Sequence, residues 1–485
     1  MTHSTSPARA GWGRPVSLVL GLAVMAAAIW LFHWTVKTSG GFNPPGEEDY
    51  YNFLVRGWRS GHLYMSKEPS PAMKALADPY DPAQNNAVRM GDASYYREHY
   101  YLYFSGAPAL VLHFPYALIT GKEIATTTAV FIFCTIGYLA SSLTWLALQR
   151  RYFATCSWWI PPLVLAVLAT STHVLVLQRR PLVWELPLSA AYASGMAMLG
   201  ALYLALHSRR PLLFTCLAGL LFGFLIACRP TCLLAAVLFT PLLWQQWKDA
   251  RDRLWLKSAI GLATGIGIFG VAVLAHNYAR FGHPAEFGVN YQLTSVREGA
   301  QAHFTPRYIF HNAYIYLLNP AQGDRHFPFV RAVPVSENSP PGYLGTWVEP
   351  TVGLAVSFPV VYALLVLPWL RRIRRDGDDR GLTVMILSML LFVSAVLGMY
   401  LIFYCATPRY MTEFTPTIMM LAGIGLLLLD QWAIERQHRF AVGLPIVTLC
   451  LATIVMGLLL FMDYHNRSLQ QLQPPIWKNL ERVFS

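Results

Sequence analysis

Long apolar runs with almost no charged residue recur along this chain and constrain its fold more than any other feature. The first run, residues 16–36, follows Arg9 and Arg14 and contains no charged residue. A hydrocarbon layer about 30 Å thick needs about 20 helical residues to cross it. The chain is 55% apolar and only 13% charged, whereas soluble domains are about 25% charged. The sequence therefore predicts an all-α, polytopic membrane helix bundle, with residues 1–485 forming a single membrane domain.

Eleven runs are long enough to be predicted spans. They lie near 16–36, 124–148, 155–177, 184–206, 211–227, 230–246, 257–277, 352–370, 381–404, 412–430 and 440–462. A further apolar segment, 101–121, contains Pro108, His113 and Pro115. Counting it as a span would invert every later loop, so we interpret it as a helix in the outer interface, where aromatic residues are favoured. Whether it spans or lies in the interface stays open.

The basic residues between the spans set the predicted orientation. If the spans alternate, the clusters at 150–151, 209–210, 248–257, 371–380 and 436–439 all become cytoplasmic, as the positive-inside bias requires. The sequence then predicts a multi-pass protein of the cell (inner) membrane, with its N-terminus in the cytoplasm and its C-terminus outside. Because the +12 net charge is spread over such short clusters, it gives no reason to expect nucleic acid as a partner.

Two long loops, about 38–123 and 278–351, fall on the outer, periplasmic or extracytoplasmic face in this topology. Loops of this length are usually functional or disordered, and these two are too aromatic for disorder. The chemistry of the protein is therefore expected between these outer loops and the bundle.

Four arginines oppose the topology signal. Arg180, Arg229, Arg280 and Arg409 all fall at the outer ends of predicted spans. Arginine binds phosphate oxygens with two parallel hydrogen bonds and keeps its charge in any surroundings. A site for an anionic, phosphate-bearing ligand would explain them. The alternative for each is a side chain that extends to the lipid headgroups.

Carboxylates form a second group of candidates. Glu47, Glu48 and Asp49 are adjacent, and like charges this close raise at least one pKa, which suits a general base. They could also hold a divalent metal ion, which the sequence leaves open, or form a solvated acidic turn. Glu185 enters the fourth span, where an ionisable residue suggests function, and Arg180 or Arg229 is its expected partner.

Aromatic residues supply a third group. Tyr96, His99 and Tyr100 belong to a stretch of tyrosines at 95–104. Such rings suit sugars as well as the headgroup zone. Tyr50 and Tyr410, next to the acidic triplet and to Arg409, are further candidates for lining a substrate site. The chain contains no glycine-rich phosphate loop or zinc-hydrolase motif.

Several sequence blocks resemble those of the GT-C superfamily of membrane glycosyltransferases, close to uncharacterised bacterial members. In the first outer loop, the acidic residues 47–49 stand just before the block YNFLVRGWRSGHLY (51–64). The block YYLYFSGAPALVLHFPYALITG (100–121) follows later in the same loop. The later blocks are RRPLVWELPL (179–188), ACRPTCLL (227–234), NYARFGHPAEFG (277–288) and PRYMTEFTP (408–416).

The resemblance implies an inverting hexosyl- or pentosyltransferase that moves a sugar from a polyprenyl-phosphate donor to a lipid or glycan acceptor among membrane lipids. A carboxylate of the first outer loop, Glu47 or Glu48 with Asp49 as the adjacent alternative, would take the acceptor proton. Arg180, Arg229 and Arg280 would neutralise the leaving phosphate, helped by His99 or Arg409.

Other classes of protein stay open. A transporter or flippase for a lipid-linked substrate would show inverted repeats and discontinuous helices. An O-antigen ligase or polymerase would use late-loop residues such as His303, Arg307, His311 and His326. A scaffold without activity is the third alternative.

Overall fold

The computed structural model describes residues 13–42, 49–249, 253–298, 302–335, 339–344, 349–370 and 379–484. Within them, eight helices are long and apolar enough to cross a membrane. These are α1 (Gly13–Thr38), α6 (Thr126–Tyr152), α9 (Glu185–His207), α10 (Pro211–Cys228), α12 (Leu254–Phe281), α16 (Arg380–Leu401), α17 (Thr415–Glu435) and α18 (Arg439–Leu472). Each overlaps one of the predicted apolar runs. The expected polytopic helix bundle is confirmed.

The other three predicted spans are broken into shorter pieces. α7 (Ile160–Thr170) and α8 (Val174–Arg179) are separated by His173, whose φ is +62°. The 3-10 helix η2 (Pro230–Phe239) continues as α11 (Thr240–Lys248), and α14 (Leu354–Ser357) precedes the 3-10 helix η8 (Pro359–Trp369). Pro359, the first residue of η8, lacks the N–H that a continuous α-helix needs, which explains the break after α14, and Pro241 lies where η2 changes into α11. A 3-10 helix rises about 2.0 Å per residue, so these short pieces still cover much of a bilayer. The count of eleven spans stays a prediction.

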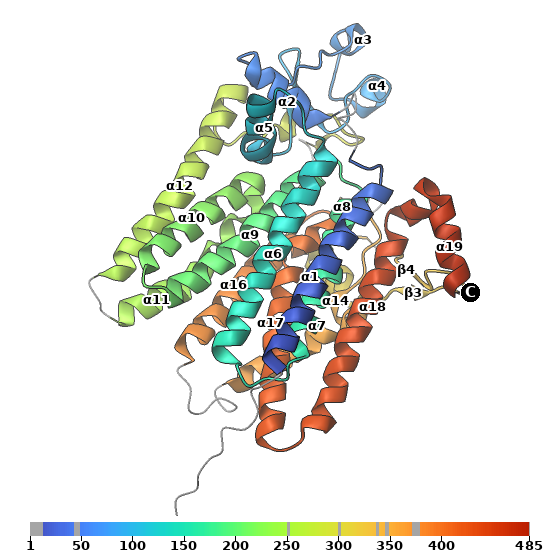
Figure 1. Cartoon of the computed structure of the whole chain (residues 1–485). Helices are drawn as coiled ribbons and strands as arrows, with labels where there is room; N and C mark the ends of the chain where they lie inside the picture. The colour runs from blue at the N-terminus through green and yellow to red at the C-terminus, as the bar shows by residue number, and fades with distance from the viewer. Residues whose placement is uncertain are drawn as a thin grey trace, which may run out of the picture.

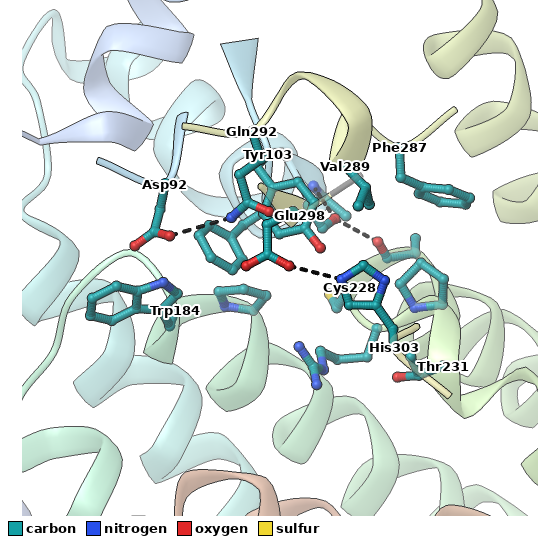
Figure 2. Close-up of a pocket in the computed structure, with 18 of the residues that line it drawn as sticks. Asp92, Tyr103, Trp184, Cys228, Thr231, Phe287, Val289, Gln292, Glu298 and His303 are labelled. Carbon is teal, nitrogen blue, oxygen red and sulfur yellow. Dashed lines mark hydrogen bonds and ion pairs between the residues drawn. The ribbon is translucent and has the colours of Figure 1, made fainter. Parts of the chain in front are cut away.

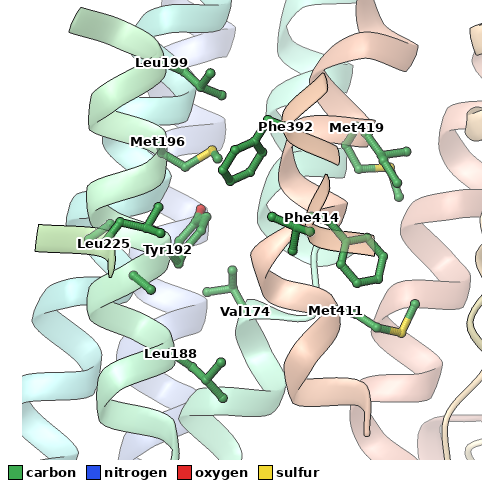
Figure 3. Close-up of a cluster of buried hydrophobic side chains, with 14 of the residues drawn as sticks. Val174, Leu188, Tyr192, Met196, Leu199, Leu225, Phe392, Met411, Phe414 and Met419 are labelled. Carbon is green, nitrogen blue, oxygen red and sulfur yellow. The ribbon is translucent and has the colours of Figure 1, made fainter. Parts of the chain in front are cut away.

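The interior of the bundle is packed from α9, α10, α16 and α17. Figure 3 shows Tyr192 and Met196 of α9 facing Phe392 of α16 and Phe414, which precedes α17. All four side chains are buried. This apolar contact fixes the helix ends from which the site described below is built.

α12 lies at the edge of the bundle and packs against α10 through glycines. A Cβ on Gly265 would lie 2.5 Å from the backbone of Gly219, and one on Gly223 would lie 2.5 Å from the Gly265 carbonyl oxygen. Lipid gives no hydrophobic drive for helices to associate, so close backbone packing between small residues does this work. The outer face of α12, including Val271 and Leu274, is exposed.

The first outer loop folds into small elements at one end of the bundle (top of Figure 1). They are α2 (Tyr50–Arg59), α3 (Pro71–Lys74), α4 (Pro82–Asn85), the strands β1 (Ala93–Tyr96) and β2 (His99–Leu102), the π-helix η1 (Ala109–His113) and α5 (Phe114–Thr120). β1 and β2 form an antiparallel hairpin in which Ala93 pairs with Leu102. The apolar helix 109–120 is about 18 Å long at 1.5 Å per residue, too short to cross a bilayer. Its length agrees with an interface helix.

The second outer loop folds against the first. Its elements are η3 (Val289–Tyr291), η5 (Pro306–Tyr308), α13 (Ile309–Ala313), η6 (Tyr314–Leu318) and the short strands β3 (Gln322–Gly323) and β4 (Val330–Arg331). The Leu293 N–H donates to the Ala93 carbonyl (2.9 Å), and the Ser94 hydroxyl donates to the Gly288 carbonyl (2.9 Å). Two further helices, η9 (Pro408–Glu413) and α19 (Pro474–Phe484), complete the chain. The beginning of the second loop therefore packs on the first at the end of the bundle, whereas β3 and β4 lie beside α18 (Figure 1).

Candidate functional site

A cavity of about 1240 Å³ lies between the two outer loops and the ends of the helices beneath them. The first loop contributes the wall around Asp92 and Tyr103, and the second contributes Gln292, Glu298 and His303 (Figure 2). The helix ends supply the rest. The location agrees with the expectation that the chemistry lies between the loops and the bundle.

All four unusual arginines line this cavity. Arg180 follows α8, Arg229 follows α10, Arg280 is in the last turn of α12, and Arg409 is in η9. A fifth, Arg89, comes from the first loop. The first three occupy C-terminal helix ends, where the helix dipole favours a cation. The structure thus gathers in one wall four residues that are spread over 230 positions of the sequence.

Two of these arginines are held by buried carboxylates. Arg229 Nε donates to Glu413 Oε1 (2.7 Å), its Nη2 donates to the Tyr400 hydroxyl (2.9 Å), and Tyr400 in turn donates to Glu413. Arg409 Nη1 lies 3.2 Å from Glu185 Oε1 and 3.4 Å from Glu349 Oε1. Burial alone would lower the pKa of Arg409, but Glu349 and Glu185 more than compensate and raise it. Both guanidinium groups are therefore permanent charges in the cavity wall.

Glu185 does not pair with the arginines expected from the sequence. Its partner is Arg409 rather than Arg180 or Arg229, because the first turn of α9 packs against η9. Its other oxygen accepts the Leu182 N–H (3.0 Å). Only 1% of Glu185 is exposed, so it supports the cavity wall from behind rather than lining it.

Arg280 differs from Arg229 and Arg409. Its Nη1 donates to the Leu102 carbonyl (2.9 Å) and its Nη2 to Asn277 Oδ1 (2.7 Å), while its buried Nε has no hydrogen-bond partner. No carboxylate of the described residues lies within 4.0 Å of it. His276, one helical turn earlier on the same face of α12, also lines the cavity, and its buried Nε2 has no partner. Arg280 is therefore a cavity-lining guanidinium group whose charge is not neutralised by a neighbouring carboxylate.

Three carboxylates also line the cavity: Asp92, Glu298 and Glu349. Glu298 Oε2 lies 2.8 Å from His303 Nε2 and 3.3 Å from the Tyr404 hydroxyl. Asp92 Oδ1 accepts a 3.3 Å hydrogen bond from Gln292 Nε2. Burial raises the pKa of the Asp92 carboxyl, because the charged form loses solvation. Cations and carboxylates thus face the same space.

The acidic triplet is only partly described. Glu47 and Glu48 lie outside the described residues. Asp49 caps α2: its carboxylate accepts the N–H groups of Tyr51 and Asn52 and both the N–H and the hydroxyl of Thr126. It is absent from the described cavity wall. The capping bonds occupy the Asp49 oxygens and give this residue a structural role.

The predicted aromatic residues are divided between the cavity and the outer loops. Of the residues expected to line a substrate site, Tyr410 lines the cavity. The His99 ring instead stacks on Tyr64, with 3.9 Å between centroids, Tyr96 packs on Phe281 and Tyr291, and Tyr100 is buried beside Tyr95. The Tyr50 hydroxyl donates to the Gly91 carbonyl (2.6 Å). These four residues are missing from the described part of the cavity wall: Tyr96, His99 and Tyr100 pack within the loops from the β1–β2 hairpin, and Tyr50 starts α2.

The histidines of the second loop are also divided. His303 lines the cavity, whereas Arg307, His311 and His326 are not among the described lining residues. His311 packs on Tyr343, and His326 is exposed beside Asp324. The described cavity wall therefore contains one member, His303, of the set expected of a ligase or polymerase.

No metal site is formed by the described residues, in which no three His, Cys, Asp or Glu side chains are close enough to hold an ion. The fold and cavity define a multi-pass membrane protein with an arginine-lined chamber at one end of its bundle. No family model matches the chain, and no curated protein matches it.

Three solved structures are similar to it. ArnT from Cupriavidus metallidurans bound to undecaprenyl phosphate is 11% identical with a TM-score of 0.40, and the match covers 96% of this chain and 78% of ArnT. The same protein in the apo state is 12% identical with a TM-score of 0.46, covering 94% of this chain and 76% of ArnT. The apo oligosaccharyltransferase of Archaeoglobus fulgidus is 11% identical with a TM-score of 0.48, covering 95% of this chain and 55% of the archaeal protein. This chain spans about half the length of the archaeal protein. Similarities this distant carry no argument about function, which must come from the cavity itself.

Proposed function

We propose that this protein is a membrane glycosyltransferase of the GT-C type. It takes a hexose or pentose from a polyprenyl-phosphate donor and passes it to a lipid or glycan acceptor on the outer face, with inversion at the anomeric carbon. The observation that carries this proposal is the set of arginines Arg180, Arg229, Arg280 and Arg409 in the wall of one cavity, among which Arg280 has no carboxylate of the described residues within 4.0 Å.

The phosphate of the donor is assigned to Arg280, with His276 beside it. An arginine that lacks a carboxylate partner gains most from binding a phosphate, and the guanidinium geometry matches phosphate oxygens. Arg229 and Arg409 stand further along the same wall, where fixed positive charge stabilises the negative charge that develops on a leaving phosphate. Arg180, which is 3.9 Å from Glu349 and 45% exposed, is the outermost of the four.

The hydrocarbon tail of the donor is assigned to the apolar side of the cavity. Leu110 of η1, Leu234 of η2 and Val273 of α12 line it. Leu110 and Leu234 are also 54% and 63% exposed, so the apolar lining continues to the outer surface of the bundle. A polyprenyl chain could leave by this route into the bilayer while its phosphate stays at Arg280.

The reaction requires a general base. The acceptor oxygen attacks the anomeric carbon, the bond from that carbon to the phosphate oxygen breaks, and the polyprenyl phosphate leaves with the electron pair. A carboxylate takes the hydroxyl proton. The sequence motif offers Glu47 and Glu48 for this step, and Asp49 offers less because capping occupies it. A divalent ion at this triplet belongs to the same proposal.

The test is made on the purified full-length protein in lipid nanodiscs. Undecaprenyl phosphate is the binding probe, and a panel of synthetic undecaprenyl-phosphoryl hexoses and pentoses supplies the donors. We expect at least one donor to be turned over with release of undecaprenyl phosphate. Arg280→Ala should weaken binding of the probe about 10- to 150-fold, because hydrogen bonds to charged groups contribute about 1.5–3 kcal/mol.

Arg307→Ala is the matched control, since Arg307 is an exposed arginine of the second outer loop that is not among the described cavity residues. It should bind the probe as the unsubstituted protein does. Equal binding by Arg280→Ala and Arg307→Ala would remove the phosphate from Arg280 and leave the proposal without its main support.

One observation favours a second function. The breaks between α7 and α8 and between α14 and η8 produce discontinuous segments, a feature common in secondary transporters. A flippase would move a fluorescent polyprenyl-phosphate sugar across proteoliposomes without cleaving it. Translocation in the absence of any released undecaprenyl phosphate would favour that function over sugar transfer.

A further inference from the structure

Asp92 lies where the two outer loops meet in the wall of the cavity. Its N–H donates to the Leu293 carbonyl (2.8 Å), and the next residue, Ala93, accepts the Leu293 N–H (2.9 Å). These contacts join segments 200 positions apart in the sequence. They hold the backbone at Asp92 on both sides.

The backbone of Asp92 is in the left-handed region, with φ at +58°. This conformation is uncommon outside glycine, although aspartate and asparagine tolerate it better than most residues. Such conformations persist where the surrounding structure enforces them, and they cluster at functional sites. Here the conformation directs a carboxylate into the cavity instead of into the hairpin.

The Asp92 carboxylate is the least neutralised of those in the wall. It accepts a 3.3 Å hydrogen bond from Gln292 Nε2, and no Lys, Arg or His nitrogen of the described residues lies within 4.0 Å of it. Glu298 has His303 at 2.8 Å, and Glu349 has Arg409 at 3.4 Å. Burial raises the pKa of Asp92. Asp92 is thus the cavity carboxylate best able to accept a proton.

The surroundings of Asp92 suit a sugar or another polyol. Figure 2 shows the Trp184 indole on the same side of the cavity as the Asp92 carboxylate, with Gln292 and Tyr103 beyond it. Burial raises the pKa of Tyr103 to about 12, so its hydroxyl stays protonated. The Gln292 amide and the Tyr103 hydroxyl can hold the hydroxyl groups of such a molecule, while the Trp184 ring carries the guanidinium groups of Arg180 and Arg409 over it at 5.5 and 4.9 Å.

We propose that Asp92 is the catalytic base of this site. Its free carboxylate oxygen takes the proton of the acceptor hydroxyl while that oxygen bonds to the anomeric carbon and the polyprenyl phosphate leaves. The proposal rests on the proposed function and moves the base from the acidic triplet to a residue 43 positions beyond Asp49. Tyr50, which holds the Gly91 carbonyl next to Asp92, is a positioning residue.

The experiment separates proton removal from every other role by changing the nucleophile. In nanodiscs, the full-length protein is given the donor identified above, with either water or azide as the acceptor. Water must lose a proton as it attacks, whereas azide attacks the anomeric carbon without deprotonation and yields a glycosyl azide. Asp92→Asn should lower hydrolysis of the donor about 10²- to 10⁴-fold, while azide transfer and undecaprenyl phosphate binding stay within a few-fold of the unsubstituted rates.

Asp92→Asn is a conservative probe because asparagine also tolerates a positive φ. Asp78→Asn is the matched control, since Asp78 lies in the same loop and pairs with Arg297 rather than facing the cavity. It should hydrolyse the donor at the unsubstituted rate.

Three results would contradict the role of Asp92. They are unchanged hydrolysis by Asp92→Asn, equal loss of azide transfer and hydrolysis, and loss of probe binding. A protein that turns over no donor with either acceptor, before any substitution, would instead contradict the proposed function, so the two failures are distinguishable.

Discussion

The two ends of the bundle use arginine in different ways. At the end with the outer loops, Arg229 and Arg409 are 17% and 14% exposed and are fixed by carboxylates around a cavity of about 1240 Å³. At the opposite end, Arg209 and Arg210 are exposed beside the start of α10, and a polar pocket of about 290 Å³ is lined by Arg151 and Arg380. Arg229 and Arg409 are thus part of a cavity wall, whereas Arg209 and Arg210 are exposed, as expected of arginines that anchor a helix at the membrane surface.

This difference shows what an unusual charge pattern can reveal. A basic residue on the cytoplasmic side needs no further explanation, because topology alone selects it. Arg180, Arg229, Arg280 and Arg409 are not explained by that rule, and all four lie in the cavity wall. The comparison is sharpened by substituting arginines at both ends and by ranking the effects.

The largest effect on stability is expected at Arg229. Arg229→Ala leaves Glu413, which is 3% exposed, as an unpaired buried charge, and breaking a buried pair in this way costs about 3–5 kcal/mol. Replacing both partners with apolar residues, Arg229→Met with Glu413→Leu, should cost less than Arg229→Ala alone. Thermal unfolding in detergent measures all three.

The Arg229–Glu413 pair is also expected to affect binding of the polyprenyl-phosphate donor. Because Arg229 lines the cavity, Arg229→Ala should weaken retention of undecaprenyl phosphate, and the double variant should not restore it. If stability and binding recover together in the double variant, Arg229 acts only by stabilising the fold. Arg229 would then no longer count as a ligand-binding arginine of the cavity end.

A smaller effect, on the pH dependence of activity and stability, is expected from the raised pKa of Asp92. A base works only when deprotonated, so activity should fall on acidification at a higher pH than for an ordinary carboxyl group of pKa about 3.9. A carboxyl whose folded-state pKa is raised binds its proton more tightly in the folded protein, so this group reduces stability as pH rises through that pKa. Asp92→Asn should therefore raise the melting temperature at neutral pH while lowering turnover.

The pH profile of donor hydrolysis and a melting curve at pH 7 test this together. A profile unaltered by Asp92→Asn would assign the titrating base to another residue, and Glu47 or Glu48 would be the next to substitute. A lower melting temperature would show that the Asp92 carboxylate stabilises the loop junction.

The helix bundle and the arginine set could be predicted from the sequence, but the carboxylates of the cavity could not. Hydropathy detects an apolar run and is blind to breaks, which is why 155–177 was expected as one span although it folds as α7 and α8. Arg229 and Arg280 were identified because they violate a rule that applies to single positions. Asp92 violates no such rule.

The cavity carboxylates could not be predicted mainly because contacts between distant segments of the chain place them in the wall. Asp92 becomes buried only when Gln292 and Leu293 of the second loop pack on it, and Glu185 pairs with an arginine 224 positions away rather than with its sequence neighbour. His276 and Arg280 did carry a local signal, since residues four apart share a helix face. That spacing could have indicated that His276 lines the same cavity wall as Arg280.

The smallest effect is expected at the end of the bundle opposite the cavity. Arg209→Ala with Arg210→Ala removes two exposed cations that make no ion pair among the described residues, so the free energy of unfolding should change by less than about 0.5 kcal/mol for each substitution. Undecaprenyl phosphate binding and donor hydrolysis should be unchanged. A reporter fused after residue 208 should lie in the cytoplasm, and reporters after 122 and 480 should lie outside. Loss of donor binding in the double variant would mean that arginines at both ends serve the lipid donor, and the distinction between anchors and site would no longer hold.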